Sequence, residues 1–315
     1  MHKSIRHLTC TSINHQSQTA GEIRLFQVSH NTNLPLWLAF GSALFWGLWW
    51  IPVRTLESVG LTGAWAGTAM FAGAIPALLI LFLSSKRRIS FAPRVVLSGA
   101  MVGIAMMLYS FAVTETTVVR AILLFYLAPI WAITLECLFL NRKFRIVNAV
   151  ALFLAAFGIL IIFRGDISLM NWNRGDAFAL ISGLCWAIGS TLIFSGEDVG
   201  ARTIALFGGI GALLVGFMML FLIGPEWTSI ENIPKTTSLL AVSGTFYITP
   251  ILIATLWSAR RLNPTTVSFL LTGEIISGVA SSAAFLNEPF SWPEILGSCI
   301  IIGAALIEII NQKQN

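Results

Sequence analysis

Apolar segments of a nearly constant length follow one another along almost the whole chain. They fall at about residues 34–53, 62–83, 95–113, 118–140, 146–163, 177–194, 203–223, 237–257, 265–286 and 293–310. About 20 apolar residues are what a helix needs to cross the hydrocarbon core of a bilayer. Charged residues make up only 10% of the chain, too few to cover the surface of a water-soluble protein of this size. A β-barrel is excluded because the segments are apolar on every face rather than alternating. The sequence predicts an all-α membrane protein with ten transmembrane helices.

The polar residues before the first segment and the distribution of cations predict the orientation. Residues 1–33 contain all four histidines and no continuous apolar core, so we expect a cytoplasmic tail. With both termini on one side, that side receives 14 of the 19 Lys and Arg residues, which predicts cytoplasmic termini and a multi-pass protein of the cell (inner) membrane. Binding of anionic lipid headgroups is a second interpretation of the basic clusters. A nucleic-acid partner is not expected.

The two halves of the chain resemble each other. A shift of 140 residues pairs Trp46 with Trp186 and six further identical residues, and a shift of 146 pairs Phe139-Leu140-Asn141 with Phe285-Leu286-Asn287. Both shifts place a segment five positions further on. Because five crossings are an odd number, the second copy must run inverted, which predicts five-helix repeats at 34–163 and 177–310. Two inverted copies are typical of alternating access around a site near the bilayer midplane. Chance similarity between apolar sequences is the alternative.

Three short patterns carry a resemblance to a known family. They are Ala43-Leu44-Phe45-Trp46-Gly47, Leu127-Ala128-Pro129-Ile130 running to Phe139-Leu140-Asn141, and Gly273-Glu274-Ile275 running to Phe285-Leu286-Asn287-Glu288. With ten segments and the repeat, the chain resembles the EamA family of the drug/metabolite transporter superfamily. The resemblance implies a secondary transporter, usually an exporter of small metabolites or drugs, with a cavity between the repeats. The family's frequent Glu-Pro pair is here Ala128-Pro129 and Glu274-Ile275, so the resemblance implies no particular substrate.

Glu274 is the strongest functional candidate. An ionisable side chain near the centre of a transmembrane helix costs about 3 kcal/mol on insertion scales, so its presence indicates a function. Ser277 and Ser281 follow at helical spacing and predict a polar face that lines a water-accessible cavity. Such a carboxylate could bind the ammonium group of a substrate or take up a proton and couple its movement to transport. The alternative is a structural Glu that is hydrogen-bonded at a helix interface.

A second carboxylate lies nearer the cytoplasmic end of its segment. Glu136 shares a helix face with Tyr126 and Pro129, and we interpret it as a gate at the inner end or as a partner of the nearby cation Arg142. Pro129 removes a backbone hydrogen bond in mid-segment, which predicts a hinge.

A stripe of aromatic residues leads to a cation at the outer face. Trp46, Trp50 and Arg54 follow at four-residue steps, an arrangement that could receive a carboxylate-bearing or aromatic solute. Interfacial tryptophans and an Arg54–Glu57 ion pair are the alternative interpretation. Arg120 is a second candidate cation at this face.

The residue inventory argues against other classes of protein. No His occurs within the segments, and the chain has neither a Gly-x-Ser-x-Gly elbow nor a phosphate-binding loop, so no enzyme, metal site, cofactor or ATP-driven transport is expected. Gly99-x-x-x-Gly103 favours close packing within the chain over dimerisation, and a homodimer remains open. We predict a metabolite exporter for amino acids or related solutes that works by alternating access, either proton-coupled or facilitative. A receptor or assembly scaffold that transports nothing is the alternative.

Overall fold

Helices make up nearly all of the chain that the structure describes. The computed structural model describes residues 33–85, 90–128, 130–131, 134–135, 146–162, 172–194, 200–223, 232–262, 270–271, 273–286 and 291–313. These ranges contain no strand, which agrees with the predicted all-α class. The expected tail lies outside the described residues, apart from Asn33. The fold described below is that of the unit Pro35–Asn315.

Six helices of the described ranges are long and apolar enough to cross a membrane: Leu34–Glu57, Ala64–Leu83, Pro93–Glu115, Arg174–Ile193, Ala201–Leu222 and Ile233–Ala259. The chain is therefore a multi-pass membrane protein. In order, its elements are α1 (Asn33–Gly47), α2 (Trp50–Glu57), α3 (Ala64–Leu83), α4 (Pro93–Glu115), α5 (Val118–Phe125), α7 (Ile146–Ile162), α8 (Arg174–Phe194), α9 (Ala201–Ile223), α10 (Ile233–Ala241), η2 (Val242–Ile248), α11 (Thr249–Ala259), α13 (Gly273–Leu286) and α14 (Trp292–Lys313).

The described residues of each predicted segment are mainly helical. The fourth and ninth segments are described only in part, so the count of ten transmembrane helices stays a prediction. Two segments are less regular than their apolar character suggested. The first consists of α1 and α2, and the eighth consists of α10, the π-helix η2 and α11. Interrupted helices in a membrane need partners for the backbone groups that the interruption frees.

The break between α1 and α2 lies at Leu48 and Trp49. The Leu48 N–H donates to the Phe45 carbonyl at 3.1 Å and the Trp49 N–H to the Trp46 carbonyl at 3.0 Å, so the backbone tightens to three-residue turns. Because the Leu48 N–H bonds the Phe45 carbonyl, the carbonyl of Leu44 loses its normal helical donor and is available to another part of the chain. Pro52 follows the break and has no N–H to donate.

Large apolar side chains lie on the outside of the described unit. Phe221 is 87% exposed, Leu83 70% and Phe153 69%, whereas Ser110 and Ser182 are fully buried. In water, so many exposed apolar groups would cause association. The distribution suits a bundle that turns apolar side chains to lipid and keeps its hydroxyl groups inside.

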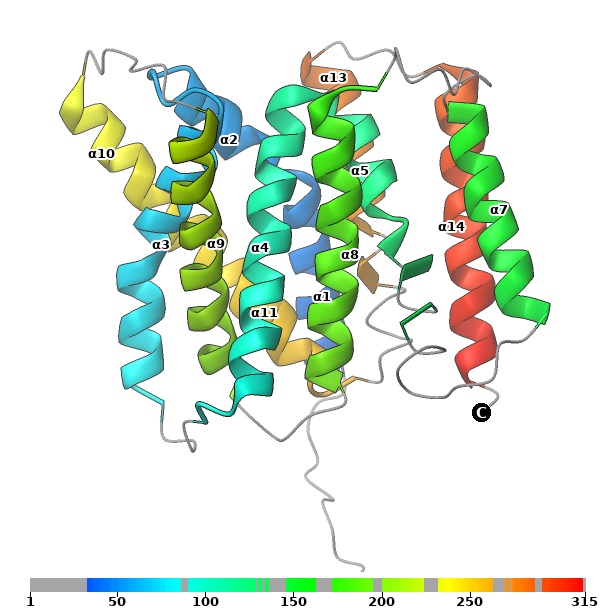
Figure 1. The fold of residues 1–315 in the computed structure, drawn as a ribbon, viewed down its shortest axis with the longest axis horizontal. Helices are drawn as coiled ribbons and strands as arrows, with labels where there is room; N and C mark the ends of the chain where they lie inside the picture. The colour runs from blue at the N-terminus through cyan, green and yellow to red at the C-terminus, as the bar shows by residue number, and fades with distance from the viewer. Residues whose placement is uncertain are drawn as a thin grey trace, which may run out of the picture. The chain divides into compact units, whose positions relative to one another are not determined.

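Glycines bring three of the long helices close together. Figure 1 shows α4 between α8 and α9, and these pairs are in extensive contact. Gly99 and Gly103 of α4 face the α9 backbone around Gly208, as expected for packing within the chain. On the neighbouring side, Gly189 of α8 approaches the α4 backbone near Val102.

Gly103→Ala is expected to destabilise the protein by about 1–3 kcal/mol, because an added methyl group would overlap the backbone of Gly208. Gly41→Ala is the matched control: it makes the same change in a helix where no atom lies within 4 Å of the new carbon. Thermal unfolding of both variants in detergent tests the prediction. Equal unfolding midpoints for the two variants would contradict it.

Candidate functional site

Glu274 lies at the start of α13 and its residue is only 7% exposed. Its Oε2 atom is 3.1 Å from the hydroxyl of Tyr126, which follows α5 directly. No described Lys or Arg forms an ion pair with this carboxyl group. Glu274 is thus a buried carboxyl group whose described neighbours are neutral.

The Tyr126 hydroxyl has a single hydrogen but two acceptors within reach. Besides the Glu274 oxygen, the Leu271 carbonyl oxygen lies 2.5 Å away. An ionised Glu274 competes with Leu271 for this hydrogen, whereas a protonated Glu274 can donate to the phenol oxygen and leave the Leu271 contact intact. Protonation of Glu274 therefore determines which of the two oxygens accepts the Tyr126 hydrogen.

All three tyrosines of the chain converge on Glu274. Tyr109 of α4 and Tyr247 of η2 are both near enough to Glu274 to interact with it electrostatically. Sequence reasoning identified only Tyr126. A signal was present for Tyr247, since Tyr is enriched at the membrane interface and Tyr247 lies at the centre of an apolar segment.

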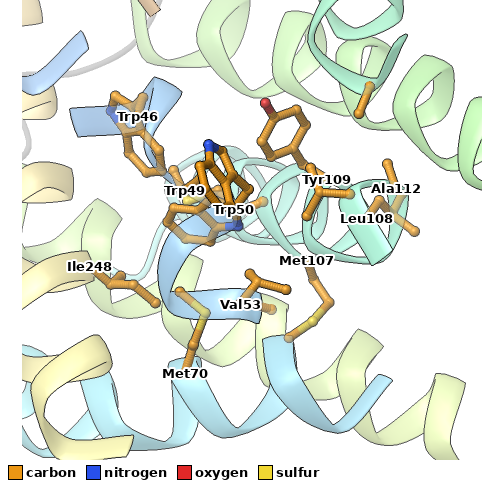
Figure 2. Packing of buried hydrophobic residues seen from close by; sticks show 14 of the residues in the cluster. Trp46, Trp49, Trp50, Val53, Met70, Met107, Leu108, Tyr109, Ala112 and Ile248 are labelled. Carbon is orange, nitrogen blue, oxygen red and sulfur yellow. The ribbon is translucent and has the colours of Figure 1, made fainter. Parts of the chain in front are cut away.

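Three tryptophans at the α1–α2 break extend this aromatic group. Trp46 and Trp49 are stacked with ring centroids 5.1 Å apart, and the Trp49 ring is 6.2 Å from that of Tyr247. Trp46, Trp49, Trp50 and Tyr109 belong to one buried cluster, part of which is drawn in Figure 2. Sequence analysis selected Trp46 and Trp50 as a stripe on one continuous helix and overlooked Trp49, which is 1% exposed.

Each of these indoles is held by a hydroxyl from a different helix. Trp46 Nε1 donates to Thr255 of α11 at 2.8 Å, Trp49 Nε1 to Ser110 of α4 at 2.9 Å, and Trp50 Nε1 to Ser281 of α13 at 3.0 Å. Buried indole N–H groups need such acceptors, and the bonds fix the orientation of each ring. The break between α1 and α2 is therefore tied to three other helices.

The same break is in close contact with α13. Ser277 Oγ donates to the Leu44 carbonyl at 2.9 Å, and the Tyr247 hydroxyl donates to the Phe45 carbonyl. A side chain at Gly47 would overlap the backbone of α13 beside Glu274. The predicted polar face of α13 thus exists, but the structure places Ser277 and Ser281 in contacts with the first segment.

Arg54, the end of the predicted stripe, lies at the far end of α2. Its Nη1 atom is 3.1 Å from Glu57 Oε2, and its Nη2 atom donates to the Val113 carbonyl at 2.8 Å. The ion pair with Glu57 is the one that the sequence offered as an alternative. A substrate role for Arg54 stays a prediction.

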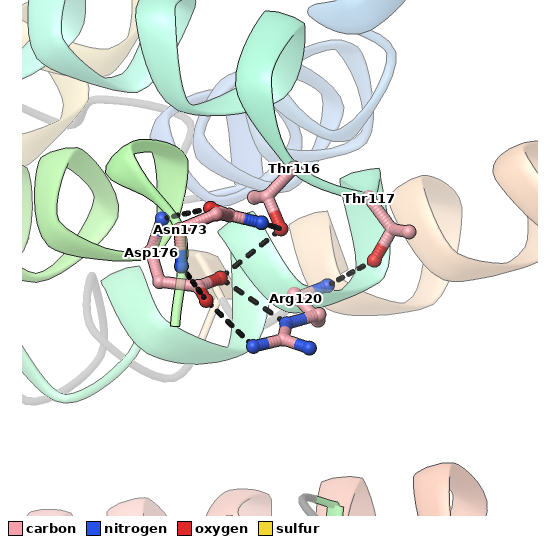
Figure 3. A network of polar contacts seen from close by, with 5 residues as sticks. All are labelled: Thr116, Thr117, Arg120, Asn173 and Asp176. Atoms are coloured by element: carbon pink, nitrogen blue, oxygen red, sulfur yellow. Dashed lines mark hydrogen bonds and ion pairs between the residues drawn. The ribbon is translucent and has the colours of Figure 1, made fainter. Parts of the chain in front are cut away.

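Arg120 takes part in a polar network where α4 ends and α5 and α8 begin (Figure 3). Its Nε and Nη2 atoms lie 3.1 and 2.6 Å from the two carboxylate oxygens of Asp176, which is fully buried. Thr116 donates to Asp176 at 3.0 Å, and Asn173 donates to Thr116 at 3.1 Å. A paired and hydrogen-bonded Asp is the form in which a charge can be buried.

Sequence reasoning missed Asp176, although a local signal precedes α8. Asn173 and Asp176 exchange hydrogen bonds, because each side-chain oxygen accepts from the other residue's backbone N–H, at 2.9 and 3.2 Å. This reciprocal pattern is the capping box of a helix start. The spacing Asn-x-x-Asp predicts such a start, but the partner Arg120 is 56 residues away in sequence.

The remaining predicted residues are placed as follows. Trp186 of α8 is half-buried with its ring 6.2 Å from Phe125, and the Phe125 ring is 5.7 Å from that of Tyr126. Trp186 therefore reaches the tyrosine group through one intervening ring. Pro129, the predicted hinge, and Glu136, the predicted gate, lie outside the described residues.

No group of three or more His, Cys, Asp or Glu side chains in the described part of the chain is arranged to hold a metal ion. The chemistry available around Glu274 is accordingly that of one carboxyl group, phenols, indoles and hydroxyls. Such groups can exchange a proton, form hydrogen bonds and offer aromatic faces to a ligand.

Comparisons with known proteins complete the description. The model of the EamA-like transporter family matches the chain twice, at residues 33–164 and 173–309. A solved structure described as "Crystal structure of protein" has a similar fold, with a TM-score of 0.58 and 16% sequence identity over 87% of this chain and 97% of that one. At this identity the likeness concerns the fold alone. No curated protein matches the chain in sequence.

Proposed function

The chain belongs to the EamA-like transporter family, and from this premise we propose that it exports small metabolites by alternating access. It is a secondary transporter of the drug/metabolite transporter type, with amino acids or related compounds as the solutes and protons as the coupling ion. It works in the cell (inner) membrane with both termini in the cytoplasm. Lipid and the solute are its partners, a homodimer is compatible with this function, and neither enzyme chemistry nor nucleic-acid binding is part of it.

The observation that carries the proposal is the position of Glu274 between the two family copies. Glu274 and Tyr247 belong to the second matched region, whereas Tyr109 and Tyr126 belong to the first. A residue that contacts both copies can respond to their relative movement. In inverted-repeat transporters the substrate and coupling ion bind at such an interface.

Protonation of Glu274 provides a physical reason for coupling. A charged carboxylate in low-dielectric surroundings needs water or a counter-charge, so ionised Glu274 favours a conformation in which the site is open to one side of the membrane. Uptake of a proton by Glu274 removes this requirement and permits the site to close. The Tyr126 hydrogen then remains with the Leu271 carbonyl, which links the proton to Leu271.

Purified protein in liposomes tests the function. Amino acids and other small metabolites are offered under an imposed pH gradient, with empty liposomes as the control. Accumulation that depends on the gradient for at least one solute class is the expected result. The absence of protein-dependent flux for every class would overturn the transport proposal and favour a receptor or scaffold.

A further inference from the structure

We propose that Arg54 is a positioning residue that holds the outer end of the bundle closed, because it links α2 to the end of α4 through the Val113 carbonyl. The outer end is the one opposite the predicted cytoplasmic termini. This inference rests on the proposed function, since alternating access requires that one end of the protein be closed while the other is open. It depends on how the helices are grouped, on where the groups meet and on the chemistry of the Arg54 contacts.

The α1–α2 break belongs to one group of helices, which we call the α13 group: α1, α2, η2, α11 and α13. The Trp46 indole donates to Thr255 of α11, and the hydroxyls of Tyr247 in η2 and Ser277 in α13 donate to carbonyl oxygens at the break. These bonds fix the start of α2 relative to α13.

A second group, the α4 group, consists of α4, α5 and α8. Ser182 of α8 donates to the Ala105 carbonyl of α4 at 2.6 Å, and Arg120 of α5 pairs with Asp176 of α8. α4 and α8 are also in extensive contact, whereas α3 and α9 contact members of both groups. The helix that carries Arg54 and the helix that carries Val113 are thus each fixed to different neighbours.

On the outer side of Glu274, described residues link the two groups by hydrogen bonds. Trp49 Nε1 donates to the Ser110 hydroxyl at 2.9 Å, and Arg54 Nη2 donates to the Val113 carbonyl at 2.8 Å. Arg54 and Val113 each lie about one turn nearer the end of their helix than Trp49 and Ser110. Of these two links, the Arg54 bond is therefore the one closer to the outer surface.

The end of α4 favours a guanidinium as its partner. Val113 lies in the last turn of α4, where carbonyl groups lack helical donors and form the negative end of the helix dipole. Arg carries a positive charge and several N–H donors in one plane. A hydrogen bond from a charged donor is stronger than one between neutral groups, so this contact stabilises the closed arrangement of α2 and α4.

The other contacts of Arg54 permit the bond to be broken. Its Nη1 atom is 3.1 Å from Glu57 Oε2 on the same helix, so Arg54 keeps its counter-charge when α2 and α4 separate. Its Nε atom is buried and has no hydrogen-bond partner among the described residues. A buried donor without an acceptor costs free energy, and water that enters on opening supplies the acceptor. This gain offsets part of the lost bond and brings the closed and open conformations closer in free energy.

Access of a water-soluble maleimide to a buried cysteine measures opening of the outer end. Ile122 of α5 is fully buried where the α4 group meets α13, since a side chain at Gly278 would overlap it. Ile122→Cys is introduced into the full chain after its four natural cysteines are replaced by serine. Met107→Cys is the reference, because Met107 is equally buried but packs against α3 and α9. Labelling rates are measured on the purified protein in detergent.

Arg54→Met removes the donors and the charge but keeps a long side chain. It is expected to raise the labelling rate at position 122 about tenfold and to leave the rate at position 107 unchanged. A general loss of structure would raise both rates, so a selective increase identifies opening of the outer end.

Two carboxylate variants are the matched controls. Glu57→Gln removes the other half of the ion pair but keeps the bond to Val113, and Glu115→Gln removes a carboxylate that pairs with Arg174 at the same end of α4. Both are expected to keep the labelling rate at position 122 within about twofold of its value in the chain with Arg54, Glu57 and Glu115 intact. An unchanged rate with Arg54→Met, a parallel rise at position 107, or an equal rise with Glu57→Gln would overturn the inference.

The two proposals can fail separately, because the labelling experiment needs no solute. Gradient-driven flux in liposomes, together with a labelling rate that Arg54→Met leaves unchanged, would overturn the role of Arg54 and leave the transporter proposal in place. A selective rise at position 122 without flux of any solute would overturn the transporter proposal and support the closure of the outer end by Arg54.

Discussion

Glu274→Gln is expected to reduce proton-driven transport by about 10- to 100-fold. Gln has nearly the same shape as Glu and can still accept the hydrogen of Tyr126, but it neither ionises nor takes up a proton. Each 1.4 kcal/mol lost from the coupled step corresponds to about a tenfold reduction, so the expected reduction amounts to about 1.4–2.8 kcal/mol. Initial rates in liposomes, measured with and without a pH gradient, give the effect directly.

A loss of proton coupling in the Glu274→Gln variant can be distinguished from a loss of folded protein. Glu274→Gln should retain the unfolding midpoint and elution profile of the unmodified protein, because the buried carboxyl group is replaced by a neutral group of equal size. Transport by this variant should no longer respond to the gradient, whereas Glu115→Gln should respond normally. A variant at position 274 that keeps both the rate and the pH dependence would show that Glu274 has no coupling role.

Asp176→Ala is expected to lower the free energy of unfolding by about 2–4 kcal/mol. Removal of one partner of a buried ion pair costs about 3–5 kcal/mol because the other charge is left uncompensated. The expected value is somewhat smaller because the Arg120 side chain is 27% exposed and keeps some contact with solvent. The substitution also removes the carboxylate that caps the start of α8. Thermal or denaturant unfolding in detergent measures the change.

A second pair at the same end of the bundle is the control. Arg174 and Glu115 are 3.4 Å apart, with side chains 69% and 34% exposed. Glu115→Ala should therefore cost no more than about 1 kcal/mol. A double-mutant cycle of Asp176→Ala with Arg120→Ala should show strong coupling, because Arg120 meets both carboxylate oxygens. If Asp176→Ala and Glu115→Ala lowered the free energy of unfolding equally, the result would contradict the greater burial of Asp176.

The candidate site could be predicted in part because each charge inside a membrane costs free energy. Glu274 was identified without any structure, since a carboxylate in an apolar segment needs a physical reason. Its partners could not be identified in this way. Tyr126 is 148 residues from Glu274 in sequence, and no local pattern connects the two. Asp176 was overlooked because it lies at the start of its helix, where an acidic residue is ordinary.

The predicted stripe of Trp46, Trp50 and Arg54 shows a different limit. Four-residue spacing places side chains on one face only while the helix is continuous. The break at Leu48 and Trp49 sends the indoles of Trp46 and Trp50 to acceptors on different helices. The hydroxyl groups that donate to the free carbonyls at this break come from α13 and η2, which are far from it in sequence.

The sequence by itself determined the solvent, the helical class and the carboxylate that is the strongest functional candidate. Hydrocarbon forces backbone groups to pair within helices and makes each internal charge costly, and both effects can be recognised from residue type and spacing alone. Only the tertiary structure decided which side chains surround that carboxylate, where the first helix breaks, and that Asp176 pairs with Arg120. Those contacts join residues far apart in the chain, and they depend on how helices pack through small residues such as Gly47 and Gly103, which a linear pattern does not specify.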